Sequence, residues 1–135
     1  MRLEALSGRK EYREIAEETL ACFGGIVEHF GLYAGSYGLA LERLLLDPVQ
    51  VVVVGSGPEA ERLEAAAIAG FAINKTVIRI AFAQLVQGGI PEALAETLLN
   101  VPRPGGAFAL VCRGRTCLPP ITEVGSLLEA LEPQR

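Results

Sequence analysis

A chain of 135 residues is long enough for one domain with its own hydrophobic core, so neither disulfides nor metals are needed for stability. Half of the residues are hydrophobic, yet no apolar run approaches the roughly 20 residues that cross a bilayer, and the charged N-terminus lacks the apolar segment of a secretory signal. The net charge of −4 and the dispersed basic residues argue against a nucleic-acid surface. We therefore predict a cytoplasmic protein with neither membrane nor nucleic-acid partners.

Two helices are predicted in the first third of the chain. Over residues 12–30, apolar or small side chains recur at alternating steps of four and three, which is the pattern of a helix face. Gly24 and Gly25 weaken this helix by about 1 kcal/mol each relative to alanine, so we expect another helix to approach closely there. A second helix is predicted over residues 33–46. Together the two helices are expected to form an antiparallel hairpin over residues 1–47.

An α/β module is predicted for the rest of the chain. The β-branched run at 49–54 does not alternate, which is typical of a strand covered on both faces in a parallel sheet. Helices and strands are then predicted to alternate as follows: helix 58–71, strand 76–82, helix 91–100, strand 107–112 and helix 123–132. This βαβαβα order over 48–135 predicts a three-stranded parallel sheet with right-handed crossovers, a Rossmann-like half. The first strand is placed in the centre, order 2-1-3, because it is the most apolar, and 1–135 is expected to form a single α/β domain.

The Gly-Ser-Gly segment at 55–57 follows the first strand and opens a helix, as in dinucleotide-binding sites. However, Pro58 removes a backbone N–H that would face a phosphate, and Glu59 places negative charge where the anion would lie. A tight turn with proline at the first helical position accounts for the same residues. We therefore expect no cofactor. A small-ligand site for a nucleotide or sugar phosphate, built from 55–57 and the 113–117 loop, remains an alternative.

Cys112 and Cys117 flank a basic loop at the end of the third predicted strand. One interpretation is a thiol-redox enzyme or sensor, in which Cys112 attacks and Cys117 resolves. Arg113 and Arg115 would favour the thiolate form, and a loop that doubles back would bring the two Cα atoms within disulfide range. The other interpretation is a pair of small, partly buried residues that shape the loop. The C-x4-C spacing differs from the C-x-x-C of dithiol oxidoreductases, so both interpretations stay open.

A metal site is not predicted, because two thiolates need two more ligands and the only histidine, His29, falls in the helical hairpin. Without that histidine no Ser-His-Asp arrangement can be assembled. The third cysteine, Cys22, makes the number odd, which argues against a disulfide scaffold, and it is predicted to be a small buried group. The residues alone leave open whether the chain is an enzyme.

The string C-R-G-R-T-C-L-P-P-I-T at 112–122 resembles the end of the YyaL-type, thioredoxin-domain-containing family, whose relatives include the spermatogenesis-associated thioredoxin-like proteins. That family closes with a strand, C-x4-C, two more residues, Pro-[Ile/Val]-Thr and a short helix. The resemblance runs from about residue 10 to the end. It is supported by YREIAEETL at 12–20, GSYGLALERLL at 35–45, VVVVG at 51–55 and NKTV at 74–77.

The resemblance implies that longer relatives carry a thioredoxin-like domain and an α/α toroid before this α/β tail, with residues 10–46 matching the last toroid hairpin. The functional residues of those preceding parts have no counterpart here, so only Cys112 and Cys117 carry over. The implied function is a non-catalytic or accessory α/β module.

A hairpin without its neighbouring toroid helices would expose an apolar stripe that includes Tyr12, Phe23, Ile26 and Phe30. We therefore expect a homo-oligomer that forms through residues 10–46. A separate thioredoxin-like or toroid partner is an alternative occupant of that surface.

Overall fold

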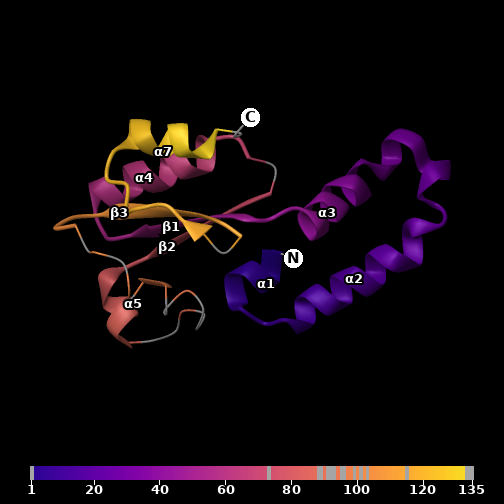
Figure 1. Ribbon diagram of the computed structural model, residues 1–135, viewed down its shortest axis with the longest axis horizontal. Helices are drawn as coiled ribbons and strands as arrows, with labels where there is room; N and C mark the ends of the chain where they lie inside the picture. Colours follow the sequence, from indigo (N-terminus) through magenta and orange to yellow (C-terminus); the bar gives the residue numbers. More distant parts are fainter. Residues whose placement is uncertain are drawn as a thin grey trace. The chain divides into compact units, whose positions relative to one another are not determined.

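The computed structural model describes residues 2–72, 74–87, 90, 94, 97–98, 100, 102, 104–114 and 116–132. The chain divides into two compact units, Met1–Asp47 and Pro48–Arg135 (Figure 1). Helices and strands are both present, so the predicted α/β class is confirmed. Within the ranges just given, no helix has the length and apolar character needed to cross a membrane.

The first unit is helical, with elements α1 (Arg2–Ser7), α2 (Glu11–Gly24), the 3₁₀ helix η1 (Val27–Ala34) and α3 (Gly35–Leu45). Arg13, near the start of α2, donates a hydrogen bond of 3.3 Å to the carbonyl of Leu44, near the end of α3. The hydroxyl of Tyr37, in the first turn of α3, donates one of 3.0 Å to the carbonyl of Leu20 in α2. Because each bond joins the start of one helix to the end of the other, α2 and α3 run antiparallel, as the sequence predicts.

The first predicted helix ends earlier than expected. A single helix over 12–30 was wrong, because α2 stops at Gly24 and Gly31 (φ +50°) interrupts η1 with a backbone conformation that favours glycine. The predicted reason for the glycines was also wrong. A methyl group on Gly24 would lie 3.5 Å from the hydroxyl of Tyr37, an ordinary contact, and one on Gly25 would meet nothing within 4 Å. The glycines therefore end the helix through their low helix propensity and are not required by close packing.

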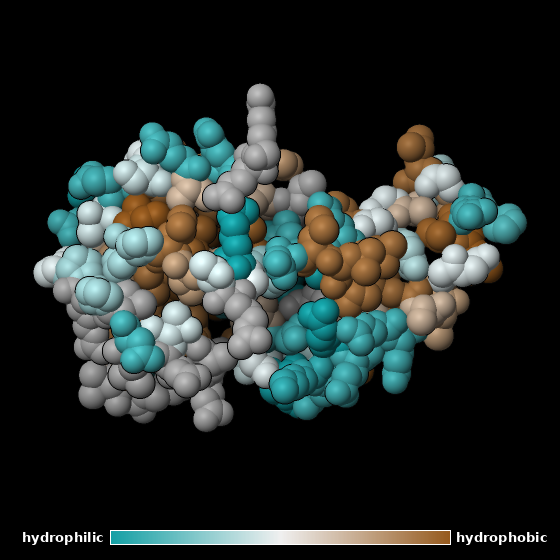
Figure 2. All heavy atoms as spheres, viewed as in Figure 1, coloured by the Kyte–Doolittle hydropathy of each residue, from teal (hydrophilic) through white to brown (hydrophobic). Residues whose placement is uncertain are grey.

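Little of this unit is buried. Among the described residues of Met1–Asp47, Leu20 is the one buried hydrophobic side chain. Cys22, predicted to be buried, is exposed on α2, where Leu20 is the buried residue. Figure 2 shows apolar surface over α3 and at the end of the hairpin.

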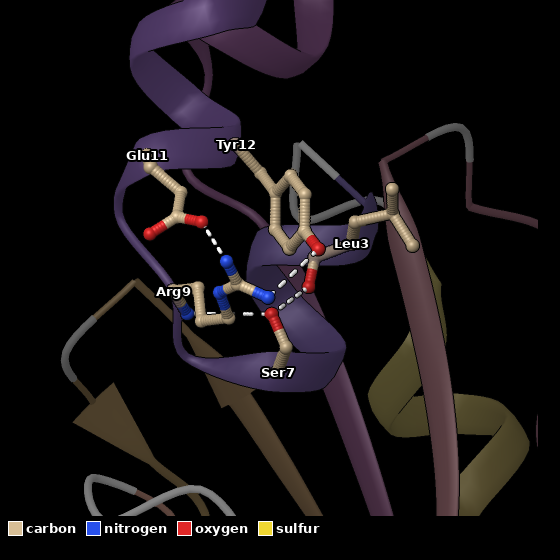
Figure 3. A network of polar contacts seen from close by, with 5 residues as sticks. All are labelled: Leu3, Ser7, Arg9, Glu11 and Tyr12. Atoms are coloured by element: carbon tan, nitrogen blue, oxygen red, sulfur yellow. Dashed lines mark hydrogen bonds and ion pairs between the residues drawn. The ribbon is translucent and has the colours of Figure 1, made fainter.

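A polar network joins α1 to α2 (Figure 3). The guanidinium of Arg9 donates hydrogen bonds to the carboxylate of Glu11 and, at 3.2 Å, to the hydroxyl of Tyr12. It also lies 4.9 Å from the centre of the Tyr12 ring, within cation–π range. The hydroxyl of Ser7 donates to the carbonyl of Leu3 and accepts a bond from the Arg9 backbone N–H. Tyr12 is therefore held by a local contact and does not belong to the freely exposed apolar surface.

The second unit is built on a sheet with strand order β2-β1-β3-β4. Its elements are β1 (Val49–Val54), α4 (Pro58–Ala69), β2 (Lys75–Ile80), α5 (Phe82–Gln87), β3 (Phe108–Arg113), β4 (Thr116–Cys117) and α7 (Val124–Leu131). The strand β1 lies between β2 and β3, as predicted, and pairs in parallel with β2. The helix predicted over 91–100 falls largely outside the described residues.

The predicted three-stranded parallel sheet was wrong in two respects. The strand β3 runs antiparallel to β1, with Val49 opposite Arg113 and Val54 opposite Phe108, and a short fourth strand, β4, pairs antiparallel with β3. The physical reason is that a strand buried on both faces has the same apolar composition whichever way it runs. The 27-residue segment between β2 and β3, 81–107, is long enough to return the chain to either end of the sheet.

Each face of the sheet has its own core. The helices α4 and α7 cover one face, and α5 lies on the other (Figure 1). On the α4 and α7 side, the core contains the fully buried strand residues Val51, Val53, Ala109 and Val111, together with Leu63 and Leu127. On the opposite side the core contains Val52, Val54, Ile80, Leu94, Leu98, Phe108 and Leu110. Burial on both faces accounts for the uninterrupted apolar sequence of β1.

Lys75 closes the C-terminal end of α4. Its ammonium group donates hydrogen bonds to the carbonyls of Ala67, Ile68 and Gly70, which no longer have partners within the helix. A positive charge at this end also complements the helix dipole. Burial lowers the pKa of Lys75 below that of a free lysine, because the charged form loses water.

Candidate functional site

Cys112 and Cys117 form a disulfide between adjacent strands. They are directly opposite each other in the β3–β4 register, with a Cα–Cα distance of 3.9 Å. At the neighbouring position of the two strands, the backbone N–H of Leu118 donates a hydrogen bond of 2.9 Å to the carbonyl of Val111. The turn that makes this pairing possible contains Gly114 (φ +56°), a conformation common in tight hairpins. The loop therefore doubles back, which is the condition for a disulfide at this spacing.

The two cysteines differ in how far they are exposed. Cys112 is 6% exposed on the inner strand β3, whereas Cys117 is half-buried on β4, the last strand in the sheet order. An attacking group from solution reaches the more exposed sulfur first. Exposure therefore favours Cys117 as the cysteine that exchanges with a partner and Cys112 as the resolving cysteine, the reverse of the prediction.

A row of polar side chains crosses the sheet and ends at the disulfide. In the register, Thr76 of β2 is beside Gln50 of β1, Gln50 is beside Cys112, and Cys112 is beside Cys117. Thr76, Gln50 and Cys112 alternate with residues of the α4 and α7 core, and Cys117 is paired with Cys112. All four therefore share the face that α4 and α7 do not cover. Thr76 and Gln50 were not predicted from the sequence, since only the strand register shows that they lie in line with the cysteines.

Arg113 does not accompany the cysteines. Successive residues of a strand point to opposite faces, so Arg113 points toward α7 while Cys112 points away from it. Its guanidinium donates hydrogen bonds of 3.0 Å to the carbonyl of Ala130 and 3.2 Å to that of Glu132, at the end of α7. This placement argues against the predicted role of Arg113 as a thiolate-stabilising charge. The second predicted charge, Arg115, lies outside the described residues.

The Gly-Ser-Gly segment forms the tight turn expected of it. Gly55 has φ +138°, and a methyl group there would lie 2.7 Å from the Cβ of Ala107, so no larger residue fits. Gly57 (φ +78°) is the N-cap of α4, and Pro58 occupies its first turn. The turn interpretation explains these residues through packing and backbone conformation.

The ligand site proposed from 55–57 and the 113–117 loop does not assemble. Val54 pairs with Phe108, whereas Gln50 pairs with Cys112, so the two segments lie at opposite ends of β1. Four residues of strand separate these ends by roughly 13 Å. The cause is the antiparallel direction of β3, which places the cysteine loop and the glycine turn at opposite ends of the strands.

A polar hollow of about 490 Å³ lies beside the first turns of α4 and α7. Its lining residues are Glu59, Arg62, Leu63, Gly106, Ala107, Thr122, Glu123, Val124 and Gly125. Two carboxylates on this lining disfavour phosphate, and Arg62 donates its Nε hydrogen bond to the carbonyl of Pro58 at 3.3 Å. This hollow was not predicted from the sequence, because it depends on where β3 places the start of α7.

A second hollow, of about 270 Å³, is apolar and lies at the tip of the helical hairpin. We call it the tip hollow. Its lining residues are Phe23, Ile26, Val27, Phe30, Tyr33, Ala34 and Tyr37. Phe23 and Phe30 are each just over half exposed, and the neighbouring Leu32 and Tyr33 are 99% and 93% exposed. Exposed apolar side chains gathered in this way make the tip hollow a candidate interaction site.

No metal centre forms in the part of the chain that the structure describes, where no three metal-binding side chains gather. Comparisons with family models, with curated proteins and with solved structures found no match. The functional interpretation therefore rests on the disulfide, the tip hollow and their surroundings.

Proposed function

We propose that this chain is a non-catalytic or accessory α/β module that self-associates through its N-terminal helices. The observation that carries the proposal is the exposed tip hollow on a helical unit with almost no core of its own. Fixing each residue's backbone costs about 1–2 kcal/mol, which folding must offset by burying apolar surface. With Leu20 as its buried hydrophobic residue, the described part of Met1–Asp47 gains little from its internal contacts. A partner surface would supply the missing burial.

The distribution of charge favours a second copy of the chain as that partner. Between Thr19 and Leu41, Glu28 and His29 are the only residues of the types Asp, Glu, Lys, Arg and His. A two-fold interface brings the same patch of each copy together, so any net charge on the patch would oppose association. A nearly neutral patch avoids this repulsion. A membrane is a poorer fit, because binding to anionic lipid depends on clustered basic residues and this segment has no lysine or arginine.

The shape of the tip also suits a reciprocal contact. Leu32 projects fully into solvent directly after the turn at Gly31, and it lies next in sequence to Tyr33, which lines the tip hollow. Each copy thus offers both an apolar side chain and an apolar hollow. Two-fold pairing allows Leu32 of each copy to enter the tip hollow of the other.

The family resemblance is compatible with this use of the hairpin. In the longer relatives that the sequence resembles, the corresponding hairpin would pack against toroid helices and brace the toroid. We propose that a second copy covers the same surface in this chain, and that the α/β unit serves as the accessory part.

The experiment measures mass by light scattering at tens of micromolar, for the full chain and for the double variant Phe23→Ser/Phe30→Ser. Leu39→Ser is the matched control, because Leu39 is 53% exposed on α3 but does not line the tip hollow. We expect a dimer or larger species for the unsubstituted chain and for the control, and a folded monomer for the double variant. A monomeric unsubstituted chain, or a chain that binds neutral lipid vesicles through the same phenylalanines, would contradict the proposal.

A further inference from the structure

We propose that the Cys112–Cys117 disulfide is a thiol–disulfide exchange site, and that an incoming thiolate enters at Cys117. This inference is independent of self-association, because it rests on the β3–β4 hairpin and uses no residue of the helical unit. Its substrate class is an unhindered thiol, supplied either by a small molecule such as glutathione or by a protein dithiol.

Access selects the entry sulfur. The strand β4 is at the end of the sheet order, and the residues on either side of Cys117, Thr116 and Leu118, are exposed. Cys112 lies on β3, which is paired with β1 on one side and β4 on the other, and it is 6% exposed. Attack on a disulfide requires that the thiolate reach one sulfur in line with the S–S bond. Cys117 is the sulfur that solution can reach from the sheet edge.

The exchange balances in two steps. An incoming thiolate forms a bond to the sulfur of Cys117, the Cys112–Cys117 bond breaks, and its electron pair leaves on Cys112 as a thiolate that takes a proton from water. A second thiol molecule, as its thiolate, then forms a bond to the incoming group's sulfur, and the bond from that sulfur to Cys117 breaks. Its electron pair leaves on Cys117 as a thiolate, which takes a proton from water. The net change is oxidation of two thiols to one disulfide and reduction of the protein disulfide to two thiols.

The surrounding backbone keeps the hairpin in place when the sulfurs separate. Leu118 remains bonded to Val111, and Ala109 and Ile121 exchange two backbone hydrogen bonds of 2.7 and 2.9 Å. The disulfide spans five positions in the sequence, a loop too short for the cross-link to restrict the unfolded chain greatly. The bond can therefore open and close without unfolding the sheet, as a reversible exchange site requires.

Two features define which thiols the site accepts. The row beside the disulfide consists of Thr76 and Gln50, so no ionic side chain within it selects a charged partner. Arg113 is engaged with the end of α7 on the opposite face. Selectivity therefore comes from access to the β4 edge, which admits small thiols and extended or protruding cysteine segments.

The test uses the full chain with Cys22→Ser, which removes the exposed free thiol of the helical unit. In that background, Cys112→Ser leaves Cys117 alone and Cys117→Ser leaves Cys112 alone. We expect oxidised glutathione to form a mixed disulfide with Cys117 at least roughly tenfold faster than with Cys112, as followed by intact mass. Equal rates, faster modification of Cys112, or modification of neither cysteine in the folded chain would overturn the proposal.

A second measurement avoids substitution at either site in case a variant fails to fold. The Cys22→Ser chain is reduced, desalted and treated with limiting N-ethylmaleimide, and peptide mapping then identifies the cysteine that reacts first. Cys117 should carry most of the label; label mainly on Cys112 would contradict the assignment.

Two reductants, each added to the oxidised chain, distinguish a small-molecule thiol from a protein dithiol as the partner. Reduction by glutathione identifies a small-thiol site, and reduction by a thioredoxin-type dithiol alone identifies a protein partner. Resistance to both, with the fold intact, would overturn the exchange function.

Discussion

Arg113 and Cys112 are neighbours in β3 but lie on opposite faces of the sheet, the arginine at the end of α7 and the cysteine in the disulfide row. Arg113→Ala should therefore lower stability without changing thiol chemistry. Loss of two hydrogen bonds to helix carbonyls predicts a decrease of about 1–3 kcal/mol in the free energy of unfolding, measured by urea denaturation. The rate of Cys117 labelling should stay within a factor of about two, since the guanidinium does not neighbour the sulfur.

The matched control is Arg79→Ala, which removes an ion pair of 2.9 Å with Glu64 on the same face of the sheet. Both of its side chains are about a third or more exposed, so its loss should cost no more than about 1 kcal/mol. A slower Cys117 reaction in Arg113→Ala, with stability unchanged, would restore the thiolate-tuning role.

Gly55 is predicted to tolerate no side chain. Its φ of +138° disfavours L residues, and an added methyl group would overlap Ala107 at 2.7 Å. Gly55→Ala should lower the free energy of unfolding by about 2–4 kcal/mol. Thermal unfolding followed by circular dichroism measures the loss.

Gly125 provides the opposite case in the same unit. It lies in the first turn of α7, and a methyl group there meets nothing within 4 Å. Gly125→Ala should therefore be neutral or stabilise the chain by up to about 1 kcal/mol. Equal effects at the two glycines would contradict the account of the 55–57 turn.

Lys75 is predicted to stabilise the end of α4. Lys75→Met keeps most of the aliphatic length but leaves the carbonyls of Ala67, Ile68 and Gly70 without this donor. The free energy of unfolding should fall by about 1–2 kcal/mol. Lys10→Met, at an exposed position before α2, is the control and should change stability by less than about 0.5 kcal/mol. A loss no larger than that of the control would mean that water replaces the lysine at no cost.

Reduction of the disulfide should weaken the fold only modestly. For a five-residue separation, the entropy of loop closure predicts a loss of about 2 kcal/mol. Urea denaturation of the Cys22→Ser chain with and without a phosphine reductant measures it, with Cys22→Ser/Cys112→Ser/Cys117→Ser as the control that should not respond. Loss of the cooperative transition on reduction would show that the hairpin depends on the disulfide.

The sequence predicts the elements of this fold better than their directions. The β-branched run of β1, the glycine turn that follows it and the antiparallel helices all depend on local chemistry, and the structure contains each of them. The direction of β3 depends on a long connection whose path no local pattern encodes. Since β3 is apolar on both faces, its sequence does not indicate whether it runs parallel or antiparallel to β1.

The candidate site shows the same limit. The C-x4-C spacing allows a disulfide, but whether the thiols pair depends on the hairpin between β3 and β4, a pairing of two residues that no apolar run signals. The roles of Cys112 and Cys117, and of Arg113, depend in turn on which strand is at the sheet edge and which face each residue shares. Those relationships come from the register and not from the spacing.

The central claim is that a second copy covers the tip hollow, and a fluorescent reporter inside the hollow tests it most directly. The chain has no tryptophan, so Phe30→Trp gives a single reporter on the lining of the tip hollow, and Phe71→Trp gives a control on exposed surface of the other unit. As protein concentration rises to tens of micromolar, we predict that the emission of the Phe30→Trp chain shifts to shorter wavelength while that of Phe71→Trp stays constant. An emission maximum for Phe30→Trp that does not change with concentration, in a chain of constant monomeric mass, would contradict the account.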